Sequence, residues 1–528
     1  MLTSHGRGGM VTAPHAQASE AGLAILREGG TAIEAAVAMA ATLAVVYPHM
    51  TGIGGDGFWL IAAPDSPPVG IDASGPAGAA VDVALYRRHG LDAIPTRGPL
   101  AANTVAGTIA GWQAALAINA RWGGNLPLAR LLEAPIAHAE RGIVVTESHA
   151  GLSAGKQAEL APVAGFAAVH LPDGAPPRQG SRLRQPALGA SLRRLAAEGL
   201  DSFYRGALAR DIAGDLARGG SPLALADLAA MQAHAVAPLS VGVTGATLFN
   251  LPPPTQGLAS LMILALFDRL GVRQADGFDH VHGLVEATKQ AFLVRDRILG
   301  DPASLPEDPA RWLETAVLDR LAARIDRRHA LAWPAPVNGG DTVWLGAIDR
   351  AGRAVSMIQS LFFEFGSGLL LPETGILWQN RGSAFSLAGT GPRALAPGRK
   401  PFHTLNPALA RFADGRVMVY GTMGGEGQPQ TQAALFSRYA QFGCDLQESI
   451  SAPRWLLGRT WGEDSVTLKL ESRFDPALVA QLRAAGHAVE LLAPMTSLMG
   501  HAGAVVRHAD GSYEGASDPR SDGAAVGL

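Results

Sequence analysis

Apolar residues recur with a helical period near the start of the chain. The stretch 17–47 is rich in alanine and predicts two helices that are separated at Glu28-Gly29-Gly30-Thr31. The glycine pair ends the first helix, because glycine accepts the backbone of a helix C-terminus, and Thr31 can cap the second. Pro48 ends that second helix. A glycine-rich turn that leads into an apolar strand is expected over 51–61.

The pattern changes twice further along the chain. Residues 126–331 keep a mainly helical period. Prolines and glycines replace that period over 333–341, which predicts an exposed and flexible loop. Thr342 then begins a region of strands, where 342–348 and 354–361 predict a hairpin. A mobile loop that is joined directly to a buried strand is the geometry that a processing site needs.

Three glycines match the spacing G-x-G-x-x-G that is typical of dinucleotide-binding proteins, namely Gly52, Gly54 and Gly57. That fingerprint requires a strand before the glycines and a helix after them, so that the helix N-terminus faces the pyrophosphate. Here the helix precedes the glycines and the strand follows them. We therefore interpret the glycines as positions of close backbone packing, and we expect no nucleotide or other cofactor.

His282 and Glu286 lie four residues apart in a predicted helix, which could place two metal ligands on one face. No third ligand is evident nearby in the sequence. A solvated or hydrogen-bonded helix face is the preferred interpretation, and no metal is expected.

Composition excludes some classes of partner. Hydrophobic residues make up 48% and charged residues 17%, with a formal net charge of -3 and a pI near 6.6. The absence of a basic surplus argues against nucleic acid as the main partner. The single cysteine, Cys444, excludes an internal disulfide framework. Residues 1–14 lack an apolar core of the length that a signal peptide needs, so we expect a cytoplasmic protein without a membrane partner.

Thr342 follows Gly339-Gly340-Asp341 at the start of the predicted strand region. A threonine hydroxyl is a weak nucleophile and needs a base within reach, which its own α-amine can be when threonine is the first residue of a chain. The same hydroxyl can first attack the carbonyl of Asp341 and shift the backbone from amide to ester. Hydrolysis of that ester then releases the new N-terminus. On pattern alone, a turn before a strand is the commoner meaning of this tetrapeptide.

Several separate motifs give nearly the whole chain a resemblance to the γ-glutamyltransferase family of N-terminal nucleophile hydrolases. They are residues 29–37 together with 52–55, 252–254, 286–302, 452–454 and 515–520. The resemblance implies an α+β fold, a four-layer αββα sandwich. It also implies a precursor that is cut into a large fragment, 1–341, and a small fragment, 342–528, which remain associated as one unit. A homodimer of the processed unit is left open.

The resemblance assigns the catalytic residues position by position. It makes Thr342 the nucleophile and the bond between Asp341 and Thr342 the cleavage site. Ser360 falls where the family keeps a hydroxyl that hydrogen-bonds the nucleophile. Gly424 and Gly425 match the glycines whose backbone amides form the oxyanion hole, and such donors commonly supply several kcal/mol of transition-state stabilisation.

The γ-glutamyl pocket of the family does not carry over. Its acidic residue for the α-amine falls on Ala384 and the neighbouring glutamine on Arg381, while two serines near the α-carboxylate fall on His403 and Thr404. A buried α-ammonium with no carboxylate opposite it would cost several kcal/mol. A small substrate with a carboxylate and no amine suits Arg381 better, because a guanidinium binds a carboxylate bidentately. Arg97 and His403 are the next candidates for this anchor.

At these altered pocket positions the chain resembles the oxamate amidohydrolase branch of the family. Residues 340–344, 365–368 and 378–382 resemble that branch as well. The resemblance implies a self-cleaving enzyme that hydrolyses the linear amide oxamate to oxalate and ammonia, a step in purine nitrogen metabolism. A γ-glutamyl transferase or hydrolase, or a related acylase of larger amides, is the alternative. An uncleaved, non-catalytic homologue is the alternative from another class. Ammonia release from oxamate separates the first two, and one band or two on a denaturing gel tests the third.

Overall fold

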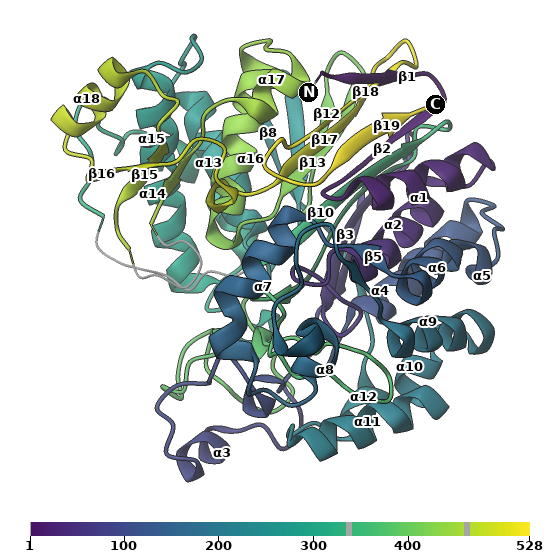
Figure 1. Cartoon of the computed structure of the whole chain (residues 1–528). Coiled ribbons are helices and arrows are strands. Elements are labelled where there is room, and N and C mark those ends of the chain that lie inside the picture. The colour runs from purple at the N-terminus through teal and green to yellow at the C-terminus, as the bar shows by residue number, and fades with distance from the viewer. Residues whose placement is uncertain (1, 334–340, 459–464) are drawn as a thin grey trace.

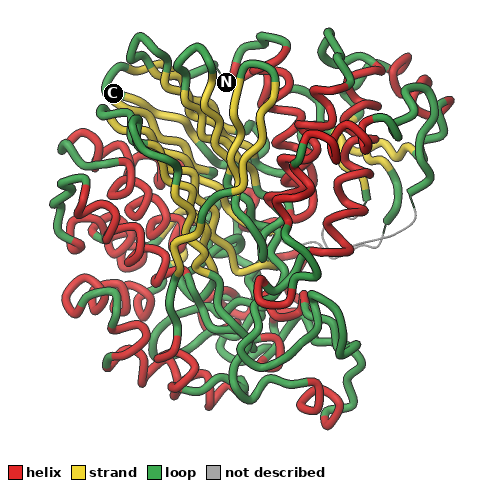
Figure 2. The backbone as a smooth tube through the Cα atoms, turned by 180° about the vertical axis from the view of Figure 1, so that it is seen from behind, coloured by secondary structure: helices red, strands yellow, loops and turns green. Residues whose placement is uncertain are grey.

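Two packed β-sheets form the centre of the molecule and helices cover both outer faces (Figures 1 and 2). The computed structural model describes residues 2–333, 341–458 and 465–528. Most of the predicted loop at 333–341 lies outside the described residues, at 334–340. The layers are those of the predicted αββα sandwich, so the expected fold class is confirmed.

One sheet, which we call sheet II, carries the predicted nucleophile. Its strands are antiparallel, in the order β19 (Ala524–Gly527), β2 (Gly9–Ala13), β10 (Asp341–Asp349), β11 (Ala354–Phe362), β3 (Asp56–Ala62), β4 (Val69–Ala73) and β7 (His234–Val236). Strands from before and after the predicted cut are therefore mixed in one hydrogen-bonded sheet. A cut after Asp341, the first residue of β10, would leave the ladders from Val343 onward intact.

The second sheet, sheet I, faces sheet II across an apolar layer. Its antiparallel order is β1 (Ser4–Gly6), β18 (Tyr513–Ser517), β17 (Ala502–Arg507), β13 (Val417–Thr422), β12 (Ala408–Phe412), β9 (Ala246–Asn250) and β8 (Leu239–Val243). Phe58 and Trp344 of sheet II pack with Leu409 and Val505 of sheet I in this layer. Alternate side chains of a strand face opposite sides, so each sheet also presents an apolar face to its helices.

Different helices cover the two sheets. Sheet II packs against α1 (Ala16–Arg27), α2 (Ala32–Val46) and α4 (Thr108–Arg121), with α5 (Leu128–Leu131), α6 (Glu133–Arg141) and α9 (Pro186–Glu198) beyond them. Sheet I packs against α13 (Gly257–Arg269), α16 (Gln428–Phe436) and α17 (Leu446–Ser451), and α14 (Phe278–Ile298) packs on α13. These layers enclose two further apolar cores, so each sheet is buried on both faces.

The remaining elements lie around this sandwich. The other helices are α3 (Val83–Arg88), α7 (Glu147–Leu160), α8 (Phe166–His170), α10 (Ser202–Arg205), α11 (Ala207–Gly219), α12 (Leu225–Ala230), α15 (Thr315–Ala322) and α18 (Pro476–Ala484). Two small sheets join β14 (Trp455–Leu457), β15 (Leu468–Glu471) and β16 (Val489–Leu492), and β5 (Ile143–Val144) with β6 (Arg182–Leu183). No helix in the described ranges has both the length and the apolar character needed to cross a bilayer.

Most of the predicted elements are found. Thr31 caps α2 in a capping box, since its Oγ1 accepts from the N–H of Glu34 at 3.2 Å while the Glu34 carboxylate accepts from the Thr31 N–H at 2.8 Å. The hairpin of β10 and β11 also lies at the residues where the sequence predicts it. Region 126–331 is mainly helical as predicted, and it also contains the short strands β5, β6, β7, β8 and β9. Strands β7, β8 and β9 have their pairing partners in the two large sheets, and the local helical period could not indicate these distant contacts.

Candidate active site

Thr342 lies near the start of β10, where the pairing with β11 is irregular. Asp341 is opposite Phe362 and Val343 is opposite Gln359, so the register shifts between them. Such a bulge changes the direction of a side chain and is frequent beside active sites. Thr342 itself is fully buried.

The hydroxyl of Thr342 has a partner that the sequence did not identify. Nε2 of Gln428, the first residue of α16, donates a hydrogen bond of 3.0 Å to Thr342 Oγ1. Oε1 of Gln428 in turn accepts from the N–H of Asn406 at 3.3 Å, which fixes the orientation of the amide. Gln428 follows Gly424 and Gly425 closely in the chain, and that proximity was the available signal.

Ser360 lies on β11, one strand away from Thr342, and is opposite Asp56 of β3. Its Oγ accepts from the N–H of Phe362 at 2.8 Å. Phe362 has a φ of 84°, which is unusual for a residue with a bulky side chain and is typical of functional sites. The hydrogen bond from Ser360 to the nucleophile stays a prediction.

Gly424 and Gly425 connect β13 of sheet I to α16. Both have left-handed backbones, with φ of 116° and 53°, which glycine alone adopts without strain. They precede a helix, and backbone N–H groups at a helix N-terminus favour negative charge. The carbonyl of Gly425 is held by Gln256 Nε2 at 2.8 Å, and the same Nε2 donates to the carbonyl of Thr404 at 2.7 Å. The predicted oxyanion hole is thus connected to the predicted substrate pocket.

Arg381 begins a short helical turn, Arg381–Ala384, and is almost completely buried. Its guanidinium lies over the ring of Phe362, with Cζ 3.6 Å from the ring centroid. Nη2 donates to the carbonyl of Phe402, whereas Nε and Nη1 have no hydrogen-bond partner among the described residues. Burial lowers the pKa of Arg381 to about 9, against the opposing charge of Asp56. Two buried donors on one cation form a group that can bind an anion.

His403 and Thr404 lie beside Arg381 and Asp56 in the segment that leads into β12. Nε2 of His403 is 3.3 Å from Oδ2 of Asp56, and both residues are buried. Burial, with the charges of Arg381 and Lys400, holds the pKa of His403 well below its usual value, so the ring is neutral. Thr404 Oγ1 has no hydrogen-bond partner in the part of the chain that the structure describes. These groups place further buried polar atoms in the neighbourhood of Arg381.

The glycine turn that precedes β3 behaves as the sequence predicts. A Cβ on Gly54 would lie 2.3 Å from the carbonyl oxygen of Leu377, and one on Gly55 would lie 2.0 Å from that of Ser360. The glycines therefore permit close backbone packing. Asp56 was not among the predicted site residues, although it is the only charged residue in this turn and that isolation was a signal.

Arg97, another candidate anchor, is engaged elsewhere. Its Nη1 donates to the carbonyls of Glu364 at 2.6 Å and Gly366 at 2.5 Å, and its Nε donates to the Glu159 carboxylate at 3.0 Å. These contacts tie together loops around the site. Arg97 therefore has fewer donors for a substrate than Arg381.

The structure brings a third group to His282 and Glu286. Nε2 of His487 lies 2.9 Å from Nδ1 of His282, so three residues with metal-ligand side chains meet in one place. The sequence could not show this, because His487 is distant along the chain. The ligand atoms are already hydrogen-bonded, since Glu286 accepts from Lys289 Nζ at 2.7 Å and from the Leu331 N–H at 3.1 Å. A hydrogen-bonded network remains our interpretation.

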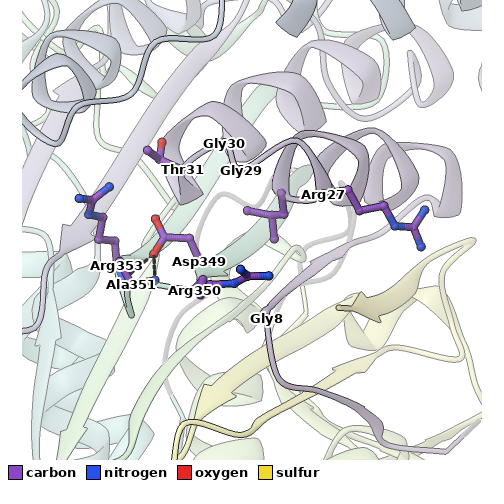
Figure 3. A pocket seen from close by; sticks show the side chains of 10 residues that line it. Gly8, Arg27, Gly29, Gly30, Thr31, Asp349, Arg350, Ala351 and Arg353 are labelled. Carbon is purple, nitrogen blue, oxygen red and sulfur yellow. Dashed lines mark hydrogen bonds between the residues drawn. The ribbon is translucent and has the colours of Figure 1, made fainter.

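An open pocket of about 440 Å³ lies at the other end of β10 (Figure 3). Arg27, Arg350 and Arg353 line it together with Asp349, whose Oδ2 accepts from the N–H of Ala32. Asp349 ends the strand on which Thr342 is the second residue, a separation of roughly 20 Å at the usual rise of a strand. This pocket is therefore separate from the candidate active site.

Comparison with known proteins agrees with this architecture. The gamma-glutamyltranspeptidase family profile matches residues 18–528. The fold and site therefore define a self-processing hydrolase, and the chain belongs to the gamma-glutamyltranspeptidase family.

Individual relatives narrow this description. The chain is 57% identical to the oxamate amidohydrolase proenzyme of Klebsiella pneumoniae, over 98% of both chains. It is 40% identical to the glutathione hydrolase-like YwrD proenzyme of Bacillus subtilis, again over 98% of both. A solved structure, cephalosporin acylase from Bacillus halodurans, matches with a TM-score of 0.92 and 30% identity, covering 100% of this chain and 97% of that one. The chain is thus an amidohydrolase and a precursor whose two fragments associate.

Proposed function

We propose that this protein hydrolyses a small amide that bears a carboxylate, namely oxamate, to give oxalate and ammonia. The observation that carries this proposal is the buried Arg381, whose Nε and Nη1 lack hydrogen-bond partners among the described residues. A carboxylate can accept a charge-assisted hydrogen bond from either of these free donors. The name of the 57% identical Klebsiella pneumoniae relative supports oxamate within that class.

Activity begins with a cut between Asp341 and Thr342. Thr342 Oγ1 attacks the carbonyl carbon of Asp341, the C–N bond breaks, and the acyl group moves from nitrogen to oxygen. Water then cleaves the ester, which leaves a carboxylate on Asp341 and a free α-amine on Thr342. The large fragment 1–341 and the small fragment 342–528 remain joined through sheet II, because β10 keeps its ladder with β2 and β11 keeps its ladder with β3.

In the processed enzyme the α-amine of Thr342 is the general base. It takes the proton of Oγ1 as that oxygen attacks the amide carbon of the substrate. The negative charge that develops on the carbonyl oxygen is stabilised by the backbone N–H groups of Gly424 and Gly425. Ammonia leaves with the proton that the amine took up, and water hydrolyses the acyl ester to regenerate Thr342.

Two polar side chains prepare the nucleophile. Gln428 holds Oγ1 of Thr342 through its 3.0 Å hydrogen bond. Ser360 supports the same hydroxyl from β11 and fixes the strained backbone of Phe362 through the 2.8 Å bond to its N–H. His403 and Thr404 contribute to the wall of the substrate pocket next to Arg381.

A γ-glutamyl hydrolase is the second candidate, because a 40% identical relative is named glutathione hydrolase-like. Ala384 occupies the position of the family's acidic residue, so a substrate ammonium would lack its partner there. The buried carboxyls of Asp56 and Glu426 already interact with the charge of Arg381. The free Nε and Nη1 donors of Arg381 are what favour an anionic group over an ammonium here.

A screen of amides on purified, processed protein tests the proposal. Oxamate, a γ-glutamyl anilide and a bulky acyl amide are compared by ammonia or anilide release under identical conditions. We expect the highest kcat/KM with oxamate. A protein that prefers the γ-glutamyl anilide contradicts the substrate assignment and leaves the threonine chemistry in place. One band on a denaturing gel, with no turnover of any amide, would indicate an uncleaved homologue.

A further inference from the structure

Asp56 has two carboxyl oxygens with very different surroundings. Oδ1 accepts three hydrogen bonds, from the N–H groups of Gly75 at 2.9 Å and Gly107 at 3.1 Å and from Nε2 of Gln379 at 3.1 Å. Oδ2 has no partner in hydrogen-bond geometry among the described residues and lies 3.3 Å from His403 Nε2. A proton added to Asp56 therefore goes to Oδ2, where neutral His403 can accept a hydrogen bond from it.

The same carboxyl is the counter-charge of Arg381. Both side chains are almost completely buried, and the negative charge of Asp56 is the strongest electrostatic support for the guanidinium. A buried charge without a compensating partner is strongly unfavourable. In the free enzyme, an ionised Asp56 therefore compensates the charge of Arg381. A substrate carboxylate that binds Arg381 adds a second negative charge beside one cation.

We propose that Asp56 determines specificity by taking up one proton when a carboxylate binds Arg381. This inference rests on the proposed function of Arg381 as the carboxylate anchor. A bound anion disfavours the ionised form of a nearby carboxyl, so the proton comes from solvent and remains on Oδ2. Anionic substrates then bind as if one proton were part of the ligand, and neutral amides do not.

The electrostatic environment of Asp56 suits such a step near neutral pH. Burial raises the pKa of Asp56 to about 7, against the hydrogen bonds from Gly75 and Gln379 and the charge of Arg381. His403 stays neutral, since burial keeps its pKa well below the usual value. The other titratable or charged groups that interact with Asp56, Arg381 or His403 are Tyr204, Arg393, Glu426 and Lys400. Burial also raises the pKa of Glu426 to about 7, but Glu426 is paired with Arg295, whereas Oδ2 of Asp56 is free to take the proton.

The sign of the pH effect follows from this linkage. Below about pH 7 Asp56 already carries its proton, so binding of a carboxylate takes up none and its Kd is constant. Above pH 7 the free enzyme loses that proton and binding must restore it. The Kd then rises by up to about tenfold for each pH unit, as expected when one proton is taken up on binding.

Calorimetric titration of processed protein with propionate between pH 6 and 8.5 tests the inference. Propionate is a short monocarboxylate that does not titrate in this range, and propionamide is its neutral counterpart. We expect the Kd of propionate to rise steeply above pH 7 and that of propionamide to stay flat. Titrations at pH 8 in two buffers of different ionisation enthalpy should show uptake of close to one proton.

Two variants sharpen the test. Asp56→Asn keeps an acceptor for the Oδ1 hydrogen bonds and cannot titrate, so its propionate Kd should be independent of pH. Asp72→Asn is the matched control, because Asp72 is a nearby buried carboxyl that binds Lys400 and Ser74 instead. It should keep the wild-type slope.

The outcomes are distinguishable from a failure of the proposed function. A flat propionate Kd in the wild-type protein overturns the inference even if Asp56→Asn does not fold. A wild-type slope that persists in Asp56→Asn overturns it as well. If propionate binds with the expected pH dependence and oxamate is not hydrolysed, the substrate assignment fails and the role of Asp56 stands.

Discussion

Gln428 Nε2 donates a 3.0 Å hydrogen bond to Oγ1 of Thr342, so the first residue of α16 contacts the proposed nucleophile directly. The contact joins the two sheets functionally, because α16 follows β13 of sheet I and Thr342 lies on β10 of sheet II. Orientation of the hydroxyl therefore depends on the packing of one sheet on the other.

Replacement of Gln428 should slow both processing and turnover. Gln428→Ala removes one hydrogen bond to the nucleophile, worth about 1–3 kcal/mol in a buried site, which corresponds to a loss in rate of roughly 5- to 160-fold. The measurement is the rate of fragment appearance and the kcat for oxamate. Gln430→Ala is the control, because Gln430 lies on the same helix and binds the carbonyl of Leu457 at 3.2 Å. Equal losses in both variants would contradict a specific role of Gln428.

Thr342→Ala should remain a single chain without activity, because the attacking hydroxyl is lost for both steps. Thr342→Ser should still be cut, since it keeps a hydroxyl and, after cleavage, an amine.

Ser360→Ala should be milder than Thr342→Ala, because it removes a supporting group and leaves the amine base in place. Denaturing gels and oxamate kinetics measure both steps. A Ser360→Ala protein that is cleaved normally and is as inactive as Thr342→Ala would refute the supporting role.

Arg381→Gln should weaken oxamate turnover far more than processing. Loss of a buried, charge-assisted contact costs roughly 2–5 kcal/mol, which is about 30-fold to several thousand-fold in kcat/KM. Processing involves no free carboxylate substrate and should continue. Arg97→Gln serves for comparison, because its guanidinium is already bound to Glu159 and to two carbonyls. Unchanged oxamate kinetics in Arg381→Gln would move the anchor to Arg97 or His403.

Stability should fall in mild acid because several histidines are buried in the neutral form. Burial lowers the pKa of His149 and His501 to about 4 and that of His170 to about 3. In the unfolded chain these histidines are protonated as the pH falls through about 6.5. In the folded chain they stay neutral until the pH reaches about 4. The stabilisation is therefore complete above pH 7 and decreases between about pH 6.5 and 4, on the order of 1–3 kcal/mol for each histidine.

Urea unfolding at pH 7.5, 6 and 5 measures this dependence. The ring of His149 stacks on that of His49, with centroids 4.9 Å apart. Neither ring nitrogen of His149 has a hydrogen-bond partner among the described residues. His149→Phe should therefore reduce the pH dependence. A free energy of unfolding that is constant over this range would contradict the buried, neutral state.

The sequence predicted the elements that local chemistry determines. The glycine pair and Thr31 gave the helix boundary, and the prolines and glycines before Thr342 gave the start of the strand region. The resemblance supplied the fold class and the candidate residues. Contacts between distant segments were not predictable, because periodicity carries no information about them. Gln428 on Thr342, Asp56 beside His403 and His487 beside His282 are all of this kind, and so are the places of β7, β8 and β9 in the sheets.

The central claim is that Thr342 becomes the N-terminal nucleophile of the active enzyme. Intact-mass measurement combined with N-terminal sequencing of the purified, oxamate-hydrolysing protein tests it most directly. The account predicts two co-purifying fragments, of which the smaller begins Thr342-Val343-Trp344. A fully active protein that consists of one uncut chain, or whose second fragment begins at another residue, would contradict it.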